Sequence, residues 1–285
     1  MPQSGTQPPD VVLGQSDFSL GVANGGSGKI SAAGMSFPFA ATVENGRLAI
    51  SDNGNHRVLI WNQIPTSNNQ PADLCLGQPD CLSNTPKTGA TGMSNPSGVR
   101  FSGSTLWVVD TSNSRVLSFD NPQTSGAAAV LAVGQPGLIS NLPNVGGQSA
   151  RTLAYPRAVF VDSGRLLIAD HGNHRALIWN RVPTQSGVPA DVVVGQADFA
   201  TSYTRPSRSR LENPTDLLVS RGALYLASEL ESRILYFAQV PKQNGQPADR
   251  VLGQPDFVST LPNNPEVPVE ERMIGPVALA AVGNR

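Results

Sequence analysis

The sequence has few charged residues, few aromatic residues and few side chains that bind metals or act as nucleophiles. Charged residues make up 14% of the 285 positions and aromatic residues 6%, and the chain has only three histidines and two cysteines. The net charge of −1 provides no general attraction to nucleic acid or to an anionic membrane. No apolar run reaches the roughly 18 residues that would predict a membrane-spanning helix. The N-terminal residues have no basic n-region followed by an apolar core, so a cytoplasmic location is the default expectation.

The two cysteines are interpreted as small buried apolar residues. Cys75 falls within an apolar strand, and Cys81 stands where three corresponding segments have Phe18, Phe199 and Phe257. A disulfide or a shared metal ion is the alternative, although no matching spacing of histidine or aspartate accompanies the pair. The sequence therefore predicts no metal site and no cofactor.

Glycine and proline, in contrast, are frequent, with 28 and 24 copies, and one glycine-containing phrase recurs. A Gly-Gln pair ends a short apolar segment five times, with its glycine at Gly14, Gly77, Gly134, Gly195 and Gly253. The spacing stays close to sixty residues, which indicates one supersecondary unit copied along the chain. The units are residues 19–78, 79–135, 136–196 and 197–254, and residues 255–285 with 10–18 make a partial fifth.

The third unit shows what each copy contains. Apolar segments at 155–161, 166–169, 175–179 and 191–194 are separated by turns rich in Gly, Asp and Asn. Short sequential strands joined by tight turns form an antiparallel meander, and strands such as RALIW are apolar on both faces. Both faces must therefore be covered, as they are when four-stranded sheets stack around an axis. The sequence predicts an all-β fold with one β-propeller domain over residues 1–285, with four complete blades and a partial fifth.

The turn between the second and third strands carries a recurring motif. DNGNHRVLIW (Asp52 to Trp61) and DHGNHRALIW (Asp170 to Trp179) resemble the NHL repeat, which is named for its Asn-His-Leu signature. The second unit replaces the histidine by Ser114, and the fourth keeps only the arginine of the motif. The resemblance covers nearly the whole chain and implies a propeller, usually of six blades. These units are longer than the roughly forty residues common in that family.

The motif residues are interpreted as a structural brace. The aspartates can cap backbone N–H groups of the turn, and the arginines can bond turn carbonyls and pair with acids of the same or the next blade. Repetition in every blade argues against catalysis, because an active site is normally unique, and no catalytic residue is predicted. The brace residues are Asp52, Asn55, Arg57, Asp110, Asn113, Arg115, Asp170, Asn173, Arg175 and Arg233.

One face of the propeller is the predicted binding surface. Because antiparallel strands alternate in direction, the turn after the second strand and the linker after the fourth open on the same face. Linkers this long are uncommon unless they have a function. The candidate binding residues there are Tyr203, Arg205, Arg208, Arg210 and His171. Acidic residues of the next linker, Glu266, Glu270 and Glu271, could neutralise the three arginines.

The most favoured function is a non-enzymatic scaffold that binds a protein or a glycan through this face. RNA is a weaker alternative, since some NHL propellers resemble RNA binders with a basic rim. A metal-dependent lyase or hydrolase is the other alternative, and it would need His56, His171 and His174 to converge from different blades.

The two ends of the chain raise the question of ring closure. Asp10 to Gly14 matches a fourth strand, and Pro276 to Val282 matches a first strand. Three explanations remain open: a fragment of a longer protein, an irregular ring of about five blades, or a homodimer that pairs the unpaired terminal strands.

Overall fold

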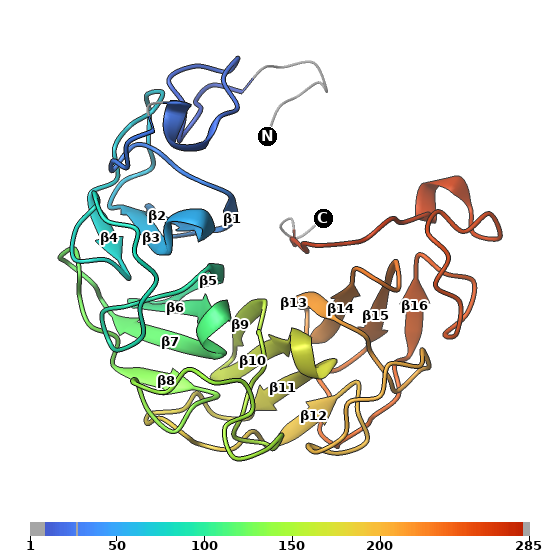
Figure 1. The fold of residues 1–285 in the computed structure, drawn as a ribbon. Helices are drawn as coiled ribbons and strands as arrows, with labels where there is room; N and C mark the ends of the chain where they lie inside the picture. The colour runs from blue at the N-terminus through green and yellow to red at the C-terminus, as the bar shows by residue number, and fades with distance from the viewer. Residues whose placement is uncertain (1–8, 27, 282–285) are drawn as a thin grey trace.

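The computed structural model describes residues 9–26 and 28–281, and nearly all of its regular structure is β-sheet. Four antiparallel sheets of four strands each follow one another around a central axis (Figure 1), which confirms the predicted propeller with four complete blades. The strands are β1 (Pro38–Glu44), β2 (Arg47–Asp52), β3 (Arg57–Trp61) and β4 (Leu74–Leu76); β5 (Pro96–Ser102), β6 (Thr105–Asp110), β7 (Arg115–Asp120) and β8 (Leu131–Val133); β9 (Ala158–Asp162), β10 (Arg165–Asp170), β11 (Arg175–Trp179) and β12 (Val192–Val194); β13 (Pro214–Ser220), β14 (Ala223–Ser228), β15 (Arg233–Phe237) and β16 (Arg250–Leu252). Within the described ranges, no helix is long and apolar enough to cross a bilayer.

Each blade is a meander whose strands are paired in sequence order. The first strand of each blade (β1, β5, β9 and β13) lies nearest the axis in Figure 1, and the fourth is a three-residue outer strand. A short 3-10 helix separates the second and third strands of the first three blades: η2 (Asn53–Asn55), η3 (Thr111–Asn113) and η4 (His171–Asn173). The remaining 3-10 helices are η1 (Ala23–Gly26) and η5 (Val269–Glu271), and both lie in linkers.

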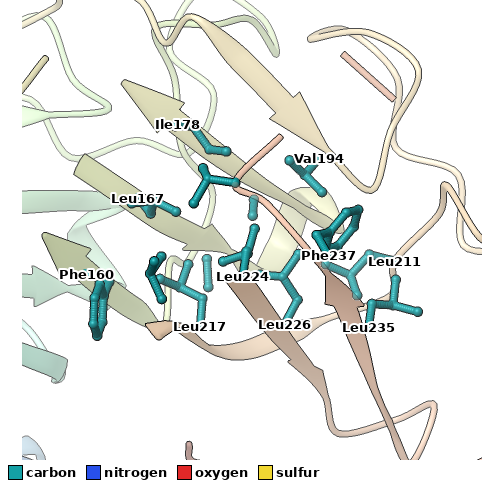
Figure 2. Packing of buried hydrophobic residues seen from close by; sticks show 14 of the residues in the cluster. Phe160, Leu167, Ile178, Val194, Leu211, Leu217, Leu224, Leu226, Leu235 and Phe237 are labelled. Carbon is teal, nitrogen blue, oxygen red and sulfur yellow. The ribbon is translucent and has the colours of Figure 1, made fainter. Parts of the chain in front are cut away.

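Apolar side chains between neighbouring blades form the core. Strands β3 and β11 are buried at every position, as the sequence pattern requires of sheets covered on both faces. Between the third and fourth blades, Phe160 and Leu167 pack with Leu217, Leu226 and Phe237, as Figure 2 shows. The blades are therefore held together face to face, and the positions of the linkers at the rim follow from this stacking.

Four of the five Gly-Gln pairs follow the outer strands β4, β8, β12 and β16, and the first, at Gly14, follows residues 10–13, which form no strand. Each glycine has a left-handed φ between 83° and 87°, which favours glycine. A Cβ atom on Gly195 would also lie 2.6 Å from the Cβ atom of Leu211. The side-chain amide of Gln196 donates to the carbonyl oxygens of His174 (2.8 Å) and Tyr203 (2.9 Å). Equivalent pairs of bonds are made by Gln78, Gln135 and Gln254.

The interpretation of the cysteines as independent apolar residues is wrong, because Cys75 and Cys81 form a disulfide. Cys75 is fully buried in β4, whereas Cys81 is half-buried and packs on the same apolar cluster. In the third and fourth blades the position of Cys81 holds Phe199 and Phe257, whose rings pack against the core. The disulfide therefore fixes the start of this linker to the outer strand by a covalent bond, where those blades use a half-buried ring that packs on the core.

The two terminal segments occupy positions that belong to further blades, but neither forms a strand over its described residues. Val12 exchanges two bonds with Asn68 and Asn69, just as Val193 does with Asn244 and Gly245, so residues 10–14 lie where an outer strand would lie. Residues 276–281 run beside β13 near the axis (Figure 1), where Thr215 donates to the carbonyl oxygen of Pro276 (2.9 Å). The side chains of Thr215 and Asp216 bond residues 276–281 to β13, in place of a backbone ladder. Val282, the last residue of the predicted strand, lies outside the described residues.

Gly195→Ala tests whether the Gly-Gln turn needs both the left-handed backbone and the space beside Leu211. Gly164 is the matched control, because it has a φ of 79° but open space around its Cβ position. Gly164→Ala should cost only the backbone strain, about 1–2 kcal/mol of unfolding free energy. Gly195→Ala should cost about 1–3 kcal/mol more because of overpacking. Urea unfolding measures both, and equal losses would contradict the steric account.

Candidate functional site

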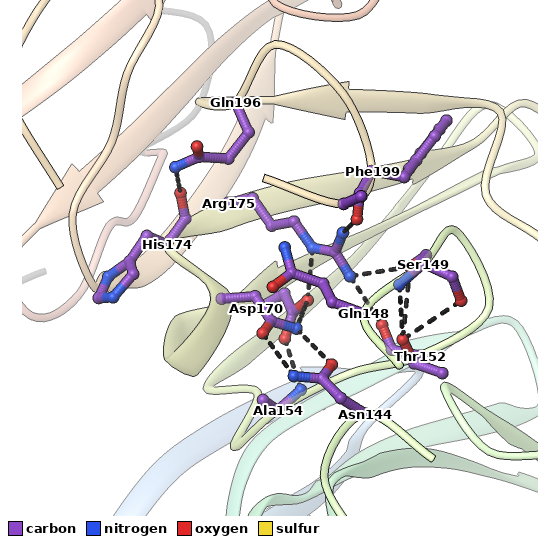
Figure 3. A network of polar contacts seen from close by, with 12 residues as sticks. Asn144, Gln148, Ser149, Thr152, Ala154, Asp170, His174, Arg175, Gln196 and Phe199 are labelled. Carbon is purple, nitrogen blue, oxygen red and sulfur yellow. Dashed lines mark hydrogen bonds and ion pairs between the residues drawn. The ribbon is translucent and has the colours of Figure 1, made fainter. Parts of the chain in front are cut away.

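The arginine at the start of the third strand organises the polar face of each blade. In the third blade the fully buried Arg175 donates from Nε to Asp170 Oδ2 (2.7 Å), as shown in Figure 3. Its Nη1 donates to the carbonyl oxygen of Phe199 (2.5 Å), and its Nη2 donates to those of Ser149 and Thr152 (both 2.9 Å). One guanidinium therefore ties the turn of its own blade to the linker before that blade and to the linker after it.

Asp170 connects the same segments through its two oxygens. Oδ2 also accepts from Asn173 Nδ2 (2.8 Å), and Oδ1 accepts from the backbone N–H of Ala154 (2.8 Å). From the sequence, the aspartate is expected to accept hydrogen bonds from backbone N–H groups of the turn. The N–H group of Ala154 belongs instead to the preceding linker. The same contacts recur in the first and second blades with Asp52, Asn55, Arg57, Asp110, Asn113 and Arg115.

The fourth blade makes the brace with a different residue. Ser228 stands where the other blades have aspartate, and Glu231 stands where they have asparagine. Arg233 donates from Nη2 to Glu231 Oε1 (2.8 Å) and from Nε to Oε2 (3.1 Å). The backbone N–H of Glu212 also donates to Glu231 Oε2 (3.2 Å). The carboxylate has thus moved three positions along the chain while the arginine remains in place. A comparison of the motif position by position does not reveal that Glu231 replaces the aspartate as the partner of Arg233.

The histidine of the motif bonds to the next blade. His174 Nδ1 accepts the backbone N–H of Asn213 (3.2 Å), and His56 Nδ1 accepts that of Asn95 (3.0 Å). In the second blade Ser114 Oγ accepts from Tyr155 in the same way (3.3 Å). Burial lowers the pKa of both histidines, which keeps Nδ1 free to accept. Each ring therefore joins its own blade to the next one, and His56 and His174 lie in different blades.

His171, a predicted binding residue, also lies at a junction. Its Nδ1 is 3.2 Å from the carbonyl oxygen of Pro214, and Asn53 and Thr111 make the equivalent bond in the first and second blades. Burial, with the nearby Arg157 charge, lowers the pKa of His171 to about 4. Its ring is therefore neutral near pH 7. No cluster of three or more potential metal-ligating side chains occurs within residues 9–26 and 28–281.

The linkers and the turns after the second strands share one face. Asn144 in a linker exchanges side-chain hydrogen bonds with Asn173 in the turn (2.8 and 2.9 Å). Asn24 and Asn55 form a matching pair in the first blade. The predicted binding surface is therefore a composite of linkers and turns, which we call the linker face.

The segment with three arginines on the linker face, residues 203–210, makes several contacts within the chain. Arg208 donates to the carbonyl oxygen of Ala248 (3.0 and 3.1 Å), and its guanidinium lies 5.1 Å from the Phe257 ring centroid. The Arg210 guanidinium lies 5.1 Å from the ring of Tyr203. Arg205 is exposed. In the described part of the chain, no ion pair joins this loop to the acidic residues at 266, 270 and 271.

Comparison with known proteins finds similarity in fold but not in sequence. No family model matches the chain, and no curated protein matches it, so the NHL repeat remains a resemblance. The periplasmic gluconolactonase of Pseudomonas aeruginosa is similar with a TM-score of 0.46 and 14% identity, over 78% of this chain and 55% of that one. A chain from a nidogen–laminin complex is similar with a TM-score of 0.45 and 14% identity, over 71% and 60%.

A catalytically inactive virginiamycin B lyase from Staphylococcus aureus is similar with a TM-score of 0.43 and 12% identity, over 75% of this chain and 58% of that one. The chain thus spans between half and three-fifths of the length of these proteins. Similarity this low carries no argument for a shared function.

The junction histidines predict a loss of stability in acid. The pKa of His171 is about 4 in the folded chain, whereas the ordinary value for histidine is 6.5, so the unfolded chain binds more protons between these values. The free energy of unfolding should therefore fall as the pH is lowered from about 6.5 towards 4. The double variant His171→Asn, His174→Ser adopts the residues of the first and second blades and should weaken this dependence. Urea unfolding across this range checks it, and an unchanged pH dependence in the variant would contradict the assignment.

Proposed function

We propose that the chain is a non-enzymatic binding scaffold of NHL-type repeats whose protein partner docks on the linker face. The observation that carries this proposal is the placement of exposed apolar side chains. Ile139 is 85% exposed and Leu82 is 70% exposed, although both follow buried strands. Other exposed apolar side chains of the linkers, including linkers of the other blades, are Phe18, Phe37, Leu142, Tyr155, Tyr203, Val258 and Leu261. Apolar side chains gathered on one face are typical of protein interaction sites.

The apolar character of the linker face favours a protein over the other partner classes. RNA recognition needs a basic surface with free arginines and stacking aromatics, whereas Arg208 is bonded to the fourth blade. A glycan would be bound mainly by polar groups around an aromatic platform, and the residues exposed here are mostly aliphatic. For the metal-dependent enzyme, the three histidine rings already make junction contacts. Aliphatic contact with another protein is thus the best-supported use of the surface.

The disulfide supports an oxidising compartment rather than the cytoplasmic default. Cys75 and Cys81 are the only cysteines of the chain and they are paired with one another. Such pairs persist in extracellular, periplasmic and lumenal proteins and are rare in reducing cytosol. A search for the partner should therefore begin among secreted or periplasmic proteins.

Photo-cross-linking from single positions tests the linker face. A photoreactive residue at Ile139 should capture the partner, because this side chain stands clear of its own blade. Ile64 is the matched control, since it is 47% exposed but lies in the loop between β3 and β4 on the opposite face. In a second experiment the photoreactive residue stands elsewhere on the linker face. There the double variant Ile139→Glu, Leu142→Glu should reduce capture of the partner by about tenfold or more. Equal capture from Ile64, or no effect of the two glutamates, would contradict the proposal.

A further inference from the structure

Comparing the blades position by position separates the repeated side chains from the unique ones. The repeated residues brace every blade, so a site that exists once must be built from residues that do not repeat. On the innermost strands two charged residues stand out. Asp216 lies where the other blades have Ala40, Gly98 and Ala158, and Arg100 lies where they have Thr42, Phe160 and Leu218.

Asp216 and Arg100 line the same cavity at the axis of the propeller. The cavity has a volume of ≈ 270 Å³ and is walled by β1, β5, β9, β13 and residues 278 and 279. Val99, Val159 and Leu217 supply an apolar wall. Three strands that are far apart in sequence therefore place an acid, a base and aliphatic side chains around one small space.

Among residues 9–26 and 28–281, the guanidinium of Arg100 forms no ion pair with a carboxylate. It stacks on the buried ring of Phe160, with 4.1 Å between the guanidinium carbon and the ring centroid. No hydrogen bond or ion pair of this guanidinium is found in the described part of the chain, whereas the buried arginines of the brace each make four hydrogen bonds, as Arg175 does. The ring fixes the plane of the guanidinium and leaves its N–H groups available for a carboxylate.

Asp216 is held from behind and keeps acceptor capacity. Its Oδ1 accepts the N–H of Leu217 (2.8 Å), and its Oδ2 accepts the N–H of Leu279 (2.6 Å). A carboxylate has about four lone-pair sites, so two acceptor positions remain. Burial raises the pKa of Asp216 to about 6, and the nearby charge of Arg100 opposes this shift. The two groups form no ion pair within the described residues, so a ligand could bond to both.

We propose that this cavity binds a small zwitterion, an α-amino acid with an aliphatic side chain. Its carboxylate bonds to Arg100, its ammonium group bonds to Asp216, and its side chain packs on Val99, Val159 and Leu217. Both charges of the ligand are matched by charges of the cavity, and the apolar wall is matched by the side chain. A simple anion would satisfy Arg100 but would lie close to the charge of Asp216.

Isothermal titration with leucine and two one-charge analogues tests the proposal. Leucine should bind saturably, while 4-methylpentanoate, which lacks the amino group, and 3-methylbutylamine, which lacks the carboxylate, should each bind about tenfold more weakly or worse, because a polar group of the cavity stays unpaired. If 4-methylpentanoate binds as well as leucine, Asp216 takes no part and the proposal is wrong. Absence of saturable binding of leucine, valine and alanine up to about 10 mM also overturns it.

Substitutions of Arg100 and Asp216 test whether each charge binds its part of the ligand. Arg100→Gln and Asp216→Asn should each weaken leucine binding by about tenfold or more. Arg250→Gln is the control, because Arg250 stacks on Tyr236 at 6.0 Å in the outer part of the fourth blade and should leave binding unchanged. Asp216→Asn also alters the bond to Leu279, so its unfolding midpoint is measured as well. Arg100→Gln leaves that bond intact, and unaltered leucine binding in this variant would by itself overturn the proposal.

Acid should weaken binding as well. Burial raises the pKa of Asp216 to about 6, and the charged side chain that faces it is Arg100 of β5, with no titratable residue among the cavity-lining residues of β1, β9 and residues 278–279. Protonation of Asp216 removes the partner of the ligand ammonium group. The affinity for leucine should therefore fall between about pH 7 and 5, and an affinity that stays constant over this range would contradict the role of Asp216.

Discussion

The buried arginine–carboxylate pair of each blade is the interaction on which the polar face of the propeller depends. A buried guanidinium is costly unless its N–H groups are bonded, and each of these arginines reaches three segments that are far apart in sequence. Removing one member of such a pair typically costs about 3–5 kcal/mol, because the remaining charge stays buried. The linkers are long and have little regular structure of their own, so these bonds determine where they lie.

This constraint also explains why the linker face can expose apolar side chains. A linker whose carbonyl oxygens are bonded to Arg175 or its equivalents is held by polar groups of its backbone. Its side chains are then free to point outward, as Ile139 does. In the proposed function the brace supplies a rigid platform, and the exposed side chains supply the contact.

The sequence predicted the blades well because the repeat and the strand pattern agree. The Gly-Gln pairs, the meander and the shared face of turns and linkers all follow from local chemistry that occurs several times. Features that occur in one blade only could not be predicted from the repeat, and the disulfide is an example. Cys81 was read by analogy with the phenylalanines at its position, although no sequence pattern gives its distance to Cys75.

Two further features could not be found by matching positions. Glu231 takes over the role of aspartate because a longer side chain from a shifted position reaches the same guanidinium, and only the structure shows that reach. Asp216 and Arg100 lie on different blades, and they become neighbours only when the innermost strands gather at the axis. The strands themselves were predictable, but which unique side chains meet there depends on the curvature of the whole assembly.

The most direct test of the brace exchanges the carboxylate position in the fourth blade. Glu231→Asn alone should cost about 3–5 kcal/mol of unfolding free energy, because Arg233 loses its buried partner. Ser228→Asp alone should also destabilise, since it places a second carboxylate beside Glu231. The double variant restores the arrangement of the first three blades and should lie within about 1 kcal/mol of the unmodified protein in urea unfolding. Losses that simply add in the double variant would contradict the claim that one carboxylate per arginine holds each blade.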